Sequence, residues 1–115
     1  MTDTPTIFER IIAREIPASI VFEDDTVIAF HDIAPQAPVH LLVVPKTAEY
    51  RDVTALAAGD PALLARLVEV ATQLAGEFAD GDFRLVFNTG AGAGQTVFHV
   101  HAHVLAGGLA EGTLG

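Results

Sequence analysis

Hydrophobic residues recur with helical spacing at the start of the chain and again in its middle. Near the N-terminus, Thr4-Pro5 and the capping-box pattern from Thr6 to Glu9 predict where a first helix begins. Pro17 closes this segment, whose apolar stripe is formed by Ile7, Phe8, Ile11 and Ile12. Asp60-Pro61 predicts a second, longer helix, because aspartate suits the N-cap and proline suits the first helical position. Its wide apolar face continues to a turn at Asp80-Gly81-Asp82 and comprises Leu63, Leu64, Leu67, Val68, Ala71, Leu74, Ala75 and Phe78.

Short apolar or alternating runs between and after these helices predict five strands. They span Ser19 to Glu23, Thr26 to Asp32, Val39 to Val44, Phe83 to Asn88 and Thr96 to Leu105. The first two are joined in the manner of a hairpin, and the third is apolar enough to be covered on both faces. The order of helices and strands predicts one α+β domain over residues 1–115, with a mostly antiparallel sheet.

The last predicted strand has two chemically different faces. Side chains alternate along a strand, so one face carries Phe98, Val100, Ala102 and Val104, and the other carries His99, His101 and His103. The apolar set is suited to a core. A lone histidine on a strand is most simply a structural residue, but three in register indicate a function.

Zinc binding is one interpretation of the histidines. An extended strand would separate the outer two Cα atoms by roughly 13 Å, whereas zinc holds each nitrogen ligand at about 2.0–2.1 Å. Residues from Asn88 to Leu105 also include no carboxylate that could complete a site. A metal site that uses His40 stays open as an alternative, but we expect no metal and no cofactor.

Phosphoryl chemistry is the other interpretation. A neutral imidazole is a competent nucleophile near pH 7, and neighbouring groups can donate protons to phosphate oxygens. Candidate donors lie close in the sequence: Asn88, the loop from Gly90 to Gly94, Gln95 and Thr96. Taken alone, the glycine loop is weak evidence and is better explained as a flexible turn. Asp32 either ends a strand or accepts hydrogen bonds from ribose hydroxyls.

The amino-acid composition limits the kinds of molecule that the protein can bind. The net charge of −9 argues against a nucleic-acid binder, which needs a basic face to neutralise phosphates. No basic residue follows Arg84, so any phosphate bound by the C-terminal third meets neutral donors. The sequence contains no cysteine, no apolar run long enough for a membrane span, and no signal-peptide pattern at its start. We therefore expect a cytoplasmic protein with no membrane association.

The stretch from His99 to Leu105 resembles the His-x-His-x-His pattern of the histidine-triad (HIT) family. The resemblance to the Hint branch of that family covers residues 7 to 108. It is carried by Ile7-Phe8, Ile16-Pro17-Ala18, Phe22-Glu23-Asp24-Asp25, Ala29-Phe30-His31-Asp32-Ile33, Pro35-Gln36-Ala37-Pro38, His40, Val44-Pro45-Lys46, Asn88, Gly94-Gln95 and Val97-Phe98-His99.

This resemblance implies a fold and an activity. The implied fold is a five-stranded antiparallel sheet with two helices, paired in a homodimer as a ten-stranded sheet. The implied activity is hydrolysis of purine nucleoside phosphoramidates or related nucleotidyl conjugates to the nucleoside monophosphate.

The resemblance also implies a role for each site residue. His101 would attack the α-phosphorus and form a nucleotidyl-histidine, while His99 and His40 would orient the triad. The phosphate would be held by His103, Asn88, Gln95 and the Gly94 backbone. Asp32 would bind the ribose, and the base pocket would be lined by Phe30, Ile33 and Leu42.

Two departures from the family pattern affect the leaving-group side. Thr96 stands where the family often has serine, and the tail from Ala106 to Gly115 is short and lacks an aromatic end. Both leave substrate preference open. The alternatives are a dinucleoside polyphosphate hydrolase and a non-catalytic dimer that binds a nucleotide or zinc.

Overall fold

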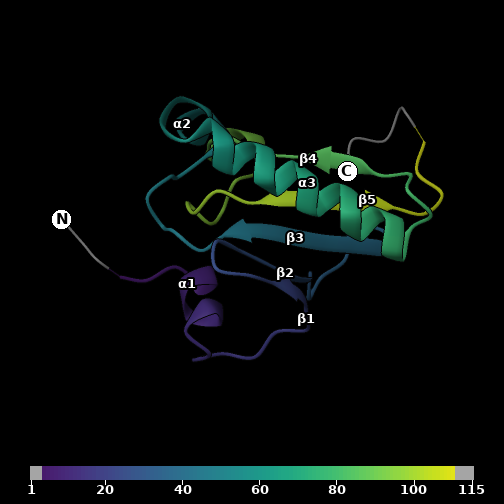
Figure 1. The fold of residues 1–115 in the computed structure, drawn as a ribbon, viewed down its shortest axis with the longest axis horizontal. Coiled ribbons are helices and arrows are strands. Elements are labelled where there is room, and N and C mark those ends of the chain that lie inside the picture. The colour runs from purple at the N-terminus through teal and green to yellow at the C-terminus, as the bar shows by residue number, and fades with distance from the viewer. Residues whose placement is uncertain (1–3, 111–115) are drawn as a thin grey trace.

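The computed structural model of the protein describes residues 4–110, which form an α+β fold (Figure 1). In chain order its elements are α1 (Ile7–Ile12), β1 (Ile20–Glu23), β2 (Val27–His31), β3 (Val39–Pro45), α2 (Val53–Gly59), α3 (Pro61–Phe78), β4 (Arg84–Val86), the short 3-10 helix η1 (Ala91–Ala93) and β5 (Ala102–Ala106). None of the helices within these residues is long and apolar enough to cross a membrane.

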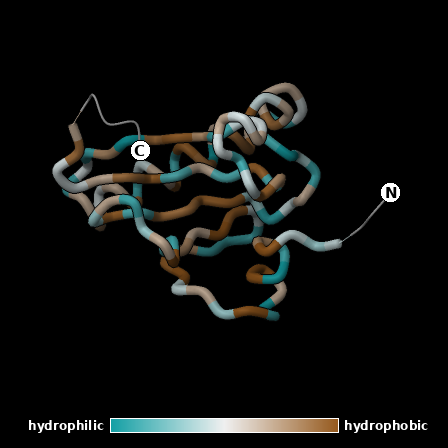
Figure 2. Tube along the Cα trace, turned by 180° about the vertical axis from the view of Figure 1, so that it is seen from behind, coloured by the Kyte–Doolittle hydropathy of each residue, from teal (hydrophilic) through white to brown (hydrophobic). Residues whose placement is uncertain are grey.

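The five strands form one antiparallel sheet in the order β1-β2-β3-β5-β4, which confirms the predicted fold class. β3 lies at the centre and is buried along almost its whole length, as its apolar run predicts. Its Leu42 pairs with His103 of β5, so the histidine segment enters the sheet beside the central strand. Figure 2 shows hydrophobic segments running along these central strands.

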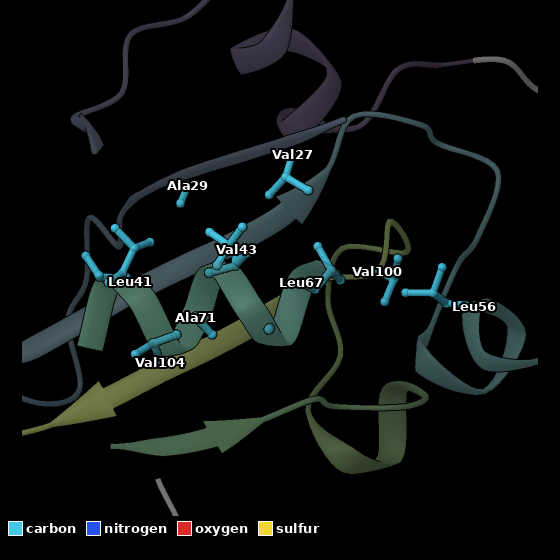
Figure 3. Close-up of a cluster of buried hydrophobic side chains, with 12 residues drawn as sticks. Val27, Ala29, Leu41, Val43, Leu56, Leu67, Ala71, Val100 and Val104 are labelled. Carbon is cyan, nitrogen blue, oxygen red and sulfur yellow. The ribbon is translucent and has the colours of Figure 1, made fainter. Parts of the chain in front are cut away.

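The main core lies between α3 and one face of the sheet. α3 begins at the predicted Asp60-Pro61 pair, where the Asp60 side chain accepts a hydrogen bond from the backbone N–H of Leu63. Figure 3 shows how side chains from this helix meet those of β2, β3 and β5. The fully buried members of the cluster are Val27, Ala29, Leu41, Val43, Leu56, Leu67, Val70, Ala71, Leu74, Val100, Ala102 and Val104.

A smaller apolar cluster covers the opposite face of the sheet. The Thr6–Glu9 capping box is formed and starts α1, which presents Phe8 and Ile11 to this face. They pack against Ile28, Phe30, Leu42 and Val44. His103 lies on the same face, because Ala102 and Val104 on either side of it point into the α3 core. The predicted division of the histidine segment into two faces is therefore confirmed for these residues.

The histidine strand is shorter than predicted. β5 contains only Ala102–Ala106, and residues 96–101 lie outside the sheet. Its partner β3 ends at Pro45, which has no backbone N–H to continue the ladder. Val100 donates instead to the carbonyl of Tyr50. Phe98, expected on the core face, is 40% exposed, with the Arg51 guanidinium 4.7 Å from its ring centre.

Two helical predictions also need correction. α1 ends at Ile12, well before Pro17, and Arg14 follows it with a left-handed φ of 63°. The sequence prediction had no counterpart of α2, a helix of seven residues. Asp52 starts it by accepting a hydrogen bond from the backbone N–H of Ala55.

Candidate active site

The three histidines differ in burial and in hydrogen bonding. The His99 side chain is fully buried, whereas those of His101 and His103 are partly buried and line a pocket. Because each ring has its own set of partners, each is expected to hold its proton on a definite nitrogen.

One ring nitrogen of His101 is fixed by a hydrogen bond, and within residues 4–110 the other has no hydrogen-bond partner. Its Nδ1 lies 2.8 Å from the His99 carbonyl oxygen, which can only accept, so the proton is on Nδ1. Nε2 then keeps an unshared electron pair. Burial lowers the pKa of His101 below its ordinary value, which keeps the ring neutral at pH 7. The Phe8 ring packs edge-on against it at 4.8 Å.

His40 sets the proton position of His103. The backbone N–H of Gln36 donates to His40 Nδ1 at 2.9 Å, so a neutral His40 carries its proton on Nε2. That nitrogen lies 3.0 Å from His103 Nδ1, which must accept. Burial lowers the pKa of His40, in keeping with a neutral ring. The backbone of Gln36 thereby leaves His103 with a proton on Nε2.

His103 and Asn88 form a pair of neutral donors. Asn88 Nδ2 lies 3.5 Å from His103 Nε2, and both atoms carry hydrogen. Burial and the neighbouring rings of His101 and His40 lower the pKa of His103 to about 4, so it donates as a neutral imidazole. Two donors at this separation can both bind one anionic oxygen placed between them.

The pocket beside these rings has a volume of about 430 Å³. It is lined on the sheet side by Phe30 and Leu42, and at its mouth by Ile33, which is 92% exposed. Its other lining residues are Ile7, Phe8, Ile11, Ile16, Pro17, Ala18, His31, Asp32, Thr96, Val97, His101 and His103. The structure therefore brings together Asp32, Thr96, two of the histidines and all three predicted base-pocket residues.

Asp32 carries the carboxylate of the pocket. One oxygen accepts a hydrogen bond from the backbone N–H of Ala34 at 2.7 Å. The other lies 3.5 Å from His40 Nε2. The Asp32 carboxylate is thus oriented by the following loop, and its remaining acceptor capacity is directed to the histidine side of the pocket.

Gln95 and Gly94, two of the predicted phosphate contacts, have hydrogen-bond partners within the protein. The Gln95 side chain is 3% exposed, accepts from Gly90 N–H and donates to the carbonyls of Arg51 and Val97. The N–H of Gly94 donates to Ala91 within the loop, and its φ of 94° requires glycine. Neither is among the described residues that line the pocket. In this arrangement they shape the glycine loop.

Asp32, His40 and His103 also place possible metal ligands within 4.8 Å of one another. A metal on His40 Nε2 would move the proton of this ring to Nδ1, where it would face the N–H of Gln36. Metal-binding histidines instead donate their second N–H to an acceptor. The hydrogen bonding of His40 therefore does not fit a metal ligand.

Three contributors to the site were missing from the sequence prediction. The N–H of Gln36 binds His40, the carbonyl of Pro45 binds His99, and the Thr6 hydroxyl lies 3.2 Å from His99 Nδ1. Two of these groups belong to the backbone, and Thr6 is 93 positions from His99. No sequence signal marks them beyond the capping pattern of Thr6.

Comparisons with known proteins agree with this fold and site. Residues 13–108 match the model of the HIT domain family. An uncharacterised HIT-like protein of Synechocystis is 52% identical, with 89% of this chain and 90% of the relative covered. Purine nucleoside phosphoramidase of Escherichia coli is 43% identical over 89% of this chain and 87% of that protein. Adenylylsulfatase HINT1 of Arabidopsis thaliana is 43% identical over 92% of this chain and 74% of that protein.

A solved structure gives the same result for the fold. A HIT family hydrolase from Clostridium thermocellum superposes with a TM-score of 0.85 at 40% identity, covering 92% of this chain and 93% of that one. The antiparallel sheet, with His103 in β5 and His99 and His101 just before it, defines a histidine-triad domain. The chain belongs to the HIT domain family.

Proposed function

We propose that this protein is a nucleotide hydrolase that cleaves purine nucleoside phosphoramidates, or related nucleotidyl conjugates, to the nucleoside monophosphate. The observation that carries the proposal is the state of His101, a neutral ring whose Nδ1–H is bound to the His99 carbonyl and whose Nε2 is unprotonated. Similarity to the E. coli purine nucleoside phosphoramidase supports the substrate class.

His101 acts as the nucleophile in two displacements. Its Nε2 electron pair forms a bond to the α-phosphorus, and the bond from phosphorus to the leaving nitrogen breaks. The His101 ring becomes cationic, and the His99 carbonyl stabilises this charge through Nδ1–H. The leaving nitrogen takes up a proton from solvent as its bond to phosphorus breaks, so that it departs as a neutral amine. Water then attacks the phosphorus and Nε2 leaves with its electron pair. One hydrogen of this water stays on the phosphate, and the other returns to solvent and replaces the proton that the amine took.

His103 and Asn88 bind the phosphoryl group during both displacements. Charge spreads over the phosphoryl oxygens in the transition state, so positioned donors supply much of the rate enhancement. His103 Nε2–H and the Asn88 amide are such donors, 3.5 Å apart. In this proposal His40 orients the triad by keeping the His103 proton on this nitrogen, which its contact with His103 Nδ1 supports.

The nucleoside occupies the pocket next to the phosphoryl site. The apolar surfaces of Phe30, Leu42 and Ile33 suit a flat purine, and the Asp32 carboxylate accepts hydrogen bonds from ribose hydroxyls. Together these residues bind the part that all candidate substrates share. The base pocket alone therefore does not select the leaving group.

Thr96 is the proposed contact to the leaving group. It lines the same pocket as His101 and His103, and a hydroxyl there can donate to a departing atom. Relatives that are equally similar to this chain carry two activity names, purine nucleoside phosphoramidase and adenylylsulfatase. A dinucleoside polyphosphate hydrolase is the second candidate, since the same phosphoryl site serves a phosphoanhydride.

Release of AMP from adenosine phosphoramidate tests the proposal. The wild-type protein is expected to release AMP, and His101→Ala is expected to lose at least about 10³-fold in kcat/KM, as expected when a nucleophile is removed. Equal rates for the two proteins would refute the mechanism. Nucleotide affinity without AMP release would instead identify a binding module.

The assembly and location form part of the proposal. β4 is at the edge of the five-strand sheet within residues 4–110, so pairing of two such edges would give a ten-stranded sheet across a homodimer. Light scattering should give twice the mass of the single domain formed by residues 1–115. A cytoplasmic location accords with the lack of cysteine.

A further inference from the structure

The first residue of the α1 capping box lies between the helix and the histidine segment. Thr6 Oγ1 is 3.2 Å from the backbone nitrogen of Glu9 and 3.2 Å from His99 Nδ1. The Glu9 carboxylate completes the capping box by accepting from Thr6 N–H at 2.8 Å. One hydroxyl therefore serves both a helix N-terminus and a buried imidazole.

The direction of each hydrogen bond follows from its partners. Glu9 N–H can only donate, so Thr6 Oγ1 accepts there. His99 Nε2 lies 2.7 Å from the Pro45 carbonyl oxygen and must donate. The neutral His99 ring then has an unprotonated Nδ1, and the Thr6 hydroxyl supplies its proton to the hydrogen bond. Burial lowers the pKa of His99, which favours this neutral form.

His99 connects Thr6 to the proposed nucleophile. Its carbonyl accepts Nδ1–H of His101, and the Phe8 ring contacts both imidazoles, at 5.8 Å from His99 and 4.8 Å from His101. The His99 side chain has no exposure to solvent, so no water can replace a lost donor without rearrangement. Any change in the His99 ring therefore acts on the backbone that holds His101.

We propose that Thr6 is a positioning residue for the nucleophile: its hydroxyl holds His99 as a neutral ring in one orientation, and His99 in turn fixes His101. This inference rests on the proposed function of His101. It gives α1 a second role beyond lining the pocket, because the N-cap residue of this helix, Thr6, also forms a hydrogen bond with His99.

Thr6→Asp separates the two roles of the hydroxyl. Aspartate is as good an N-cap as threonine, so it preserves the hydrogen bond to Glu9 N–H. A carboxylate has no proton to donate to His99 Nδ1, so His99 is expected to gain a proton. Among residues 4–110, the charged or titratable groups that face His99 are Glu9 on α1 and His101 on its own segment, and β3 contributes the neutral Pro45 carbonyl.

Matched variants complete the experiment. Thr6→Ser keeps both hydrogen bonds and should stay within about twofold of wild type in kcat and Tm. Glu9→Ala removes the reciprocal capping bond and leaves the hydroxyl in place, so it should lower Tm while kcat is retained. Thr6→Asp should keep a Tm near that of wild type and lose at least about tenfold in kcat, a barrier change of roughly 1.4 kcal/mol.

Nitrogen NMR of the imidazoles provides a readout independent of turnover. In wild type, His99 should give the signals of a neutral ring protonated on Nε2, and in Thr6→Asp those of a doubly protonated ring. Unchanged His99 and His101 signals together with wild-type kcat in Thr6→Asp would overturn the proposal. An equal loss of kcat in Glu9→Ala would also overturn it. Because the NMR comparison needs no substrate, it stands even if His101→Ala retains full activity and the proposed function fails.

Discussion

His40 Nε2 lies 3.0 Å from His103 Nδ1, and the backbone N–H of Gln36 occupies the other nitrogen of His40. This relationship makes a residue outside the His-x-His-x-His pattern responsible for the proton position of His103. It is possible because β3 and β5 are neighbours in the sheet. His40 and His103 should therefore behave as one unit.

A double-mutant cycle tests this unit. His40→Ala and His103→Ala should each lower kcat/KM, by about 10- to 100-fold for His40→Ala, because His103 then loses the partner that fixes its proton. The double variant should be no worse than the more damaging single variant by more than about threefold. Losses that multiply in the double variant would show that the two rings act separately.

The stability of the protein should fall on mild acidification. The pKa values of His40, His99, His101 and His103 are all lowered in the folded state, to about 4 for His103. An unfolded histidine takes up a proton near pH 6.5, so the unfolded state binds more protons as the pH falls below that value. The free energy of unfolding should thus decrease from about pH 6.5 towards pH 5, above the range in which carboxylates titrate.

Urea unfolding measured between pH 7.5 and 5 checks this expectation. His103→Gln provides the comparison, because it removes the ring with the most strongly lowered pKa and should flatten the curve. A free energy of unfolding that does not change with pH across this window would contradict the assignment of four neutral histidines.

The core between α3 and the sheet should be sensitive to truncation. Leu74 is fully buried, and Leu74→Ala should reduce the free energy of unfolding by about 2–5 kcal/mol. Val68 lies on the same helix but is 38% exposed, so Val68→Ala should cost less than about 1 kcal/mol. Chemical denaturation of both variants checks the comparison, and similar losses would contradict the assigned burial.

Thr96→Ser should change the preference among leaving groups. Removing the methyl group is expected to alter, by up to about tenfold, the ratio of kcat/KM for adenosine phosphoramidate to that for a dinucleoside polyphosphate. Inhibition by the shared product AMP serves as the control and should not change, because the nucleoside pocket is untouched. An unchanged ratio would show that Thr96 does not contact the leaving group.

The sequence predicted most of the fold because its strongest patterns were long or chemically distinct. Asp60-Pro61 begins α3 as predicted, and the apolar run of β3 is buried on both faces. The alternation of the histidine segment placed His103 opposite the α3 core. The predicted length of β5 was wrong because Pro45 on its partner strand β3 interrupts the ladder. The residues of the histidine segment do not reveal this interruption, since it lies on another strand.

The hydrogen bonds of the site could not be predicted from the sequence, for a different reason. The proton positions of His99, His101 and His103 depend on backbone groups and on contacts between distant segments. The resemblance to the histidine-triad family implied that Gly94 and Gln95 hold phosphate, but the Gln95 amide is already hydrogen-bonded to Gly90, Arg51 and Val97. Only the folded arrangement distinguishes a donor that is free for substrate from one already in use.

The stereochemical course at phosphorus distinguishes a nucleotidyl-His101 intermediate from direct attack by water. A substrate with a stereogenic α-phosphorus, such as one diastereomer of an adenosine phosphorothioate amide, would be hydrolysed in ¹⁸O-labelled water and the product configuration determined. Attack by His101 Nε2 followed by attack of water comprises two inversions, so net retention of configuration is expected. Net inversion would show that water attacks the substrate directly and would contradict a nucleotidyl-His101 intermediate.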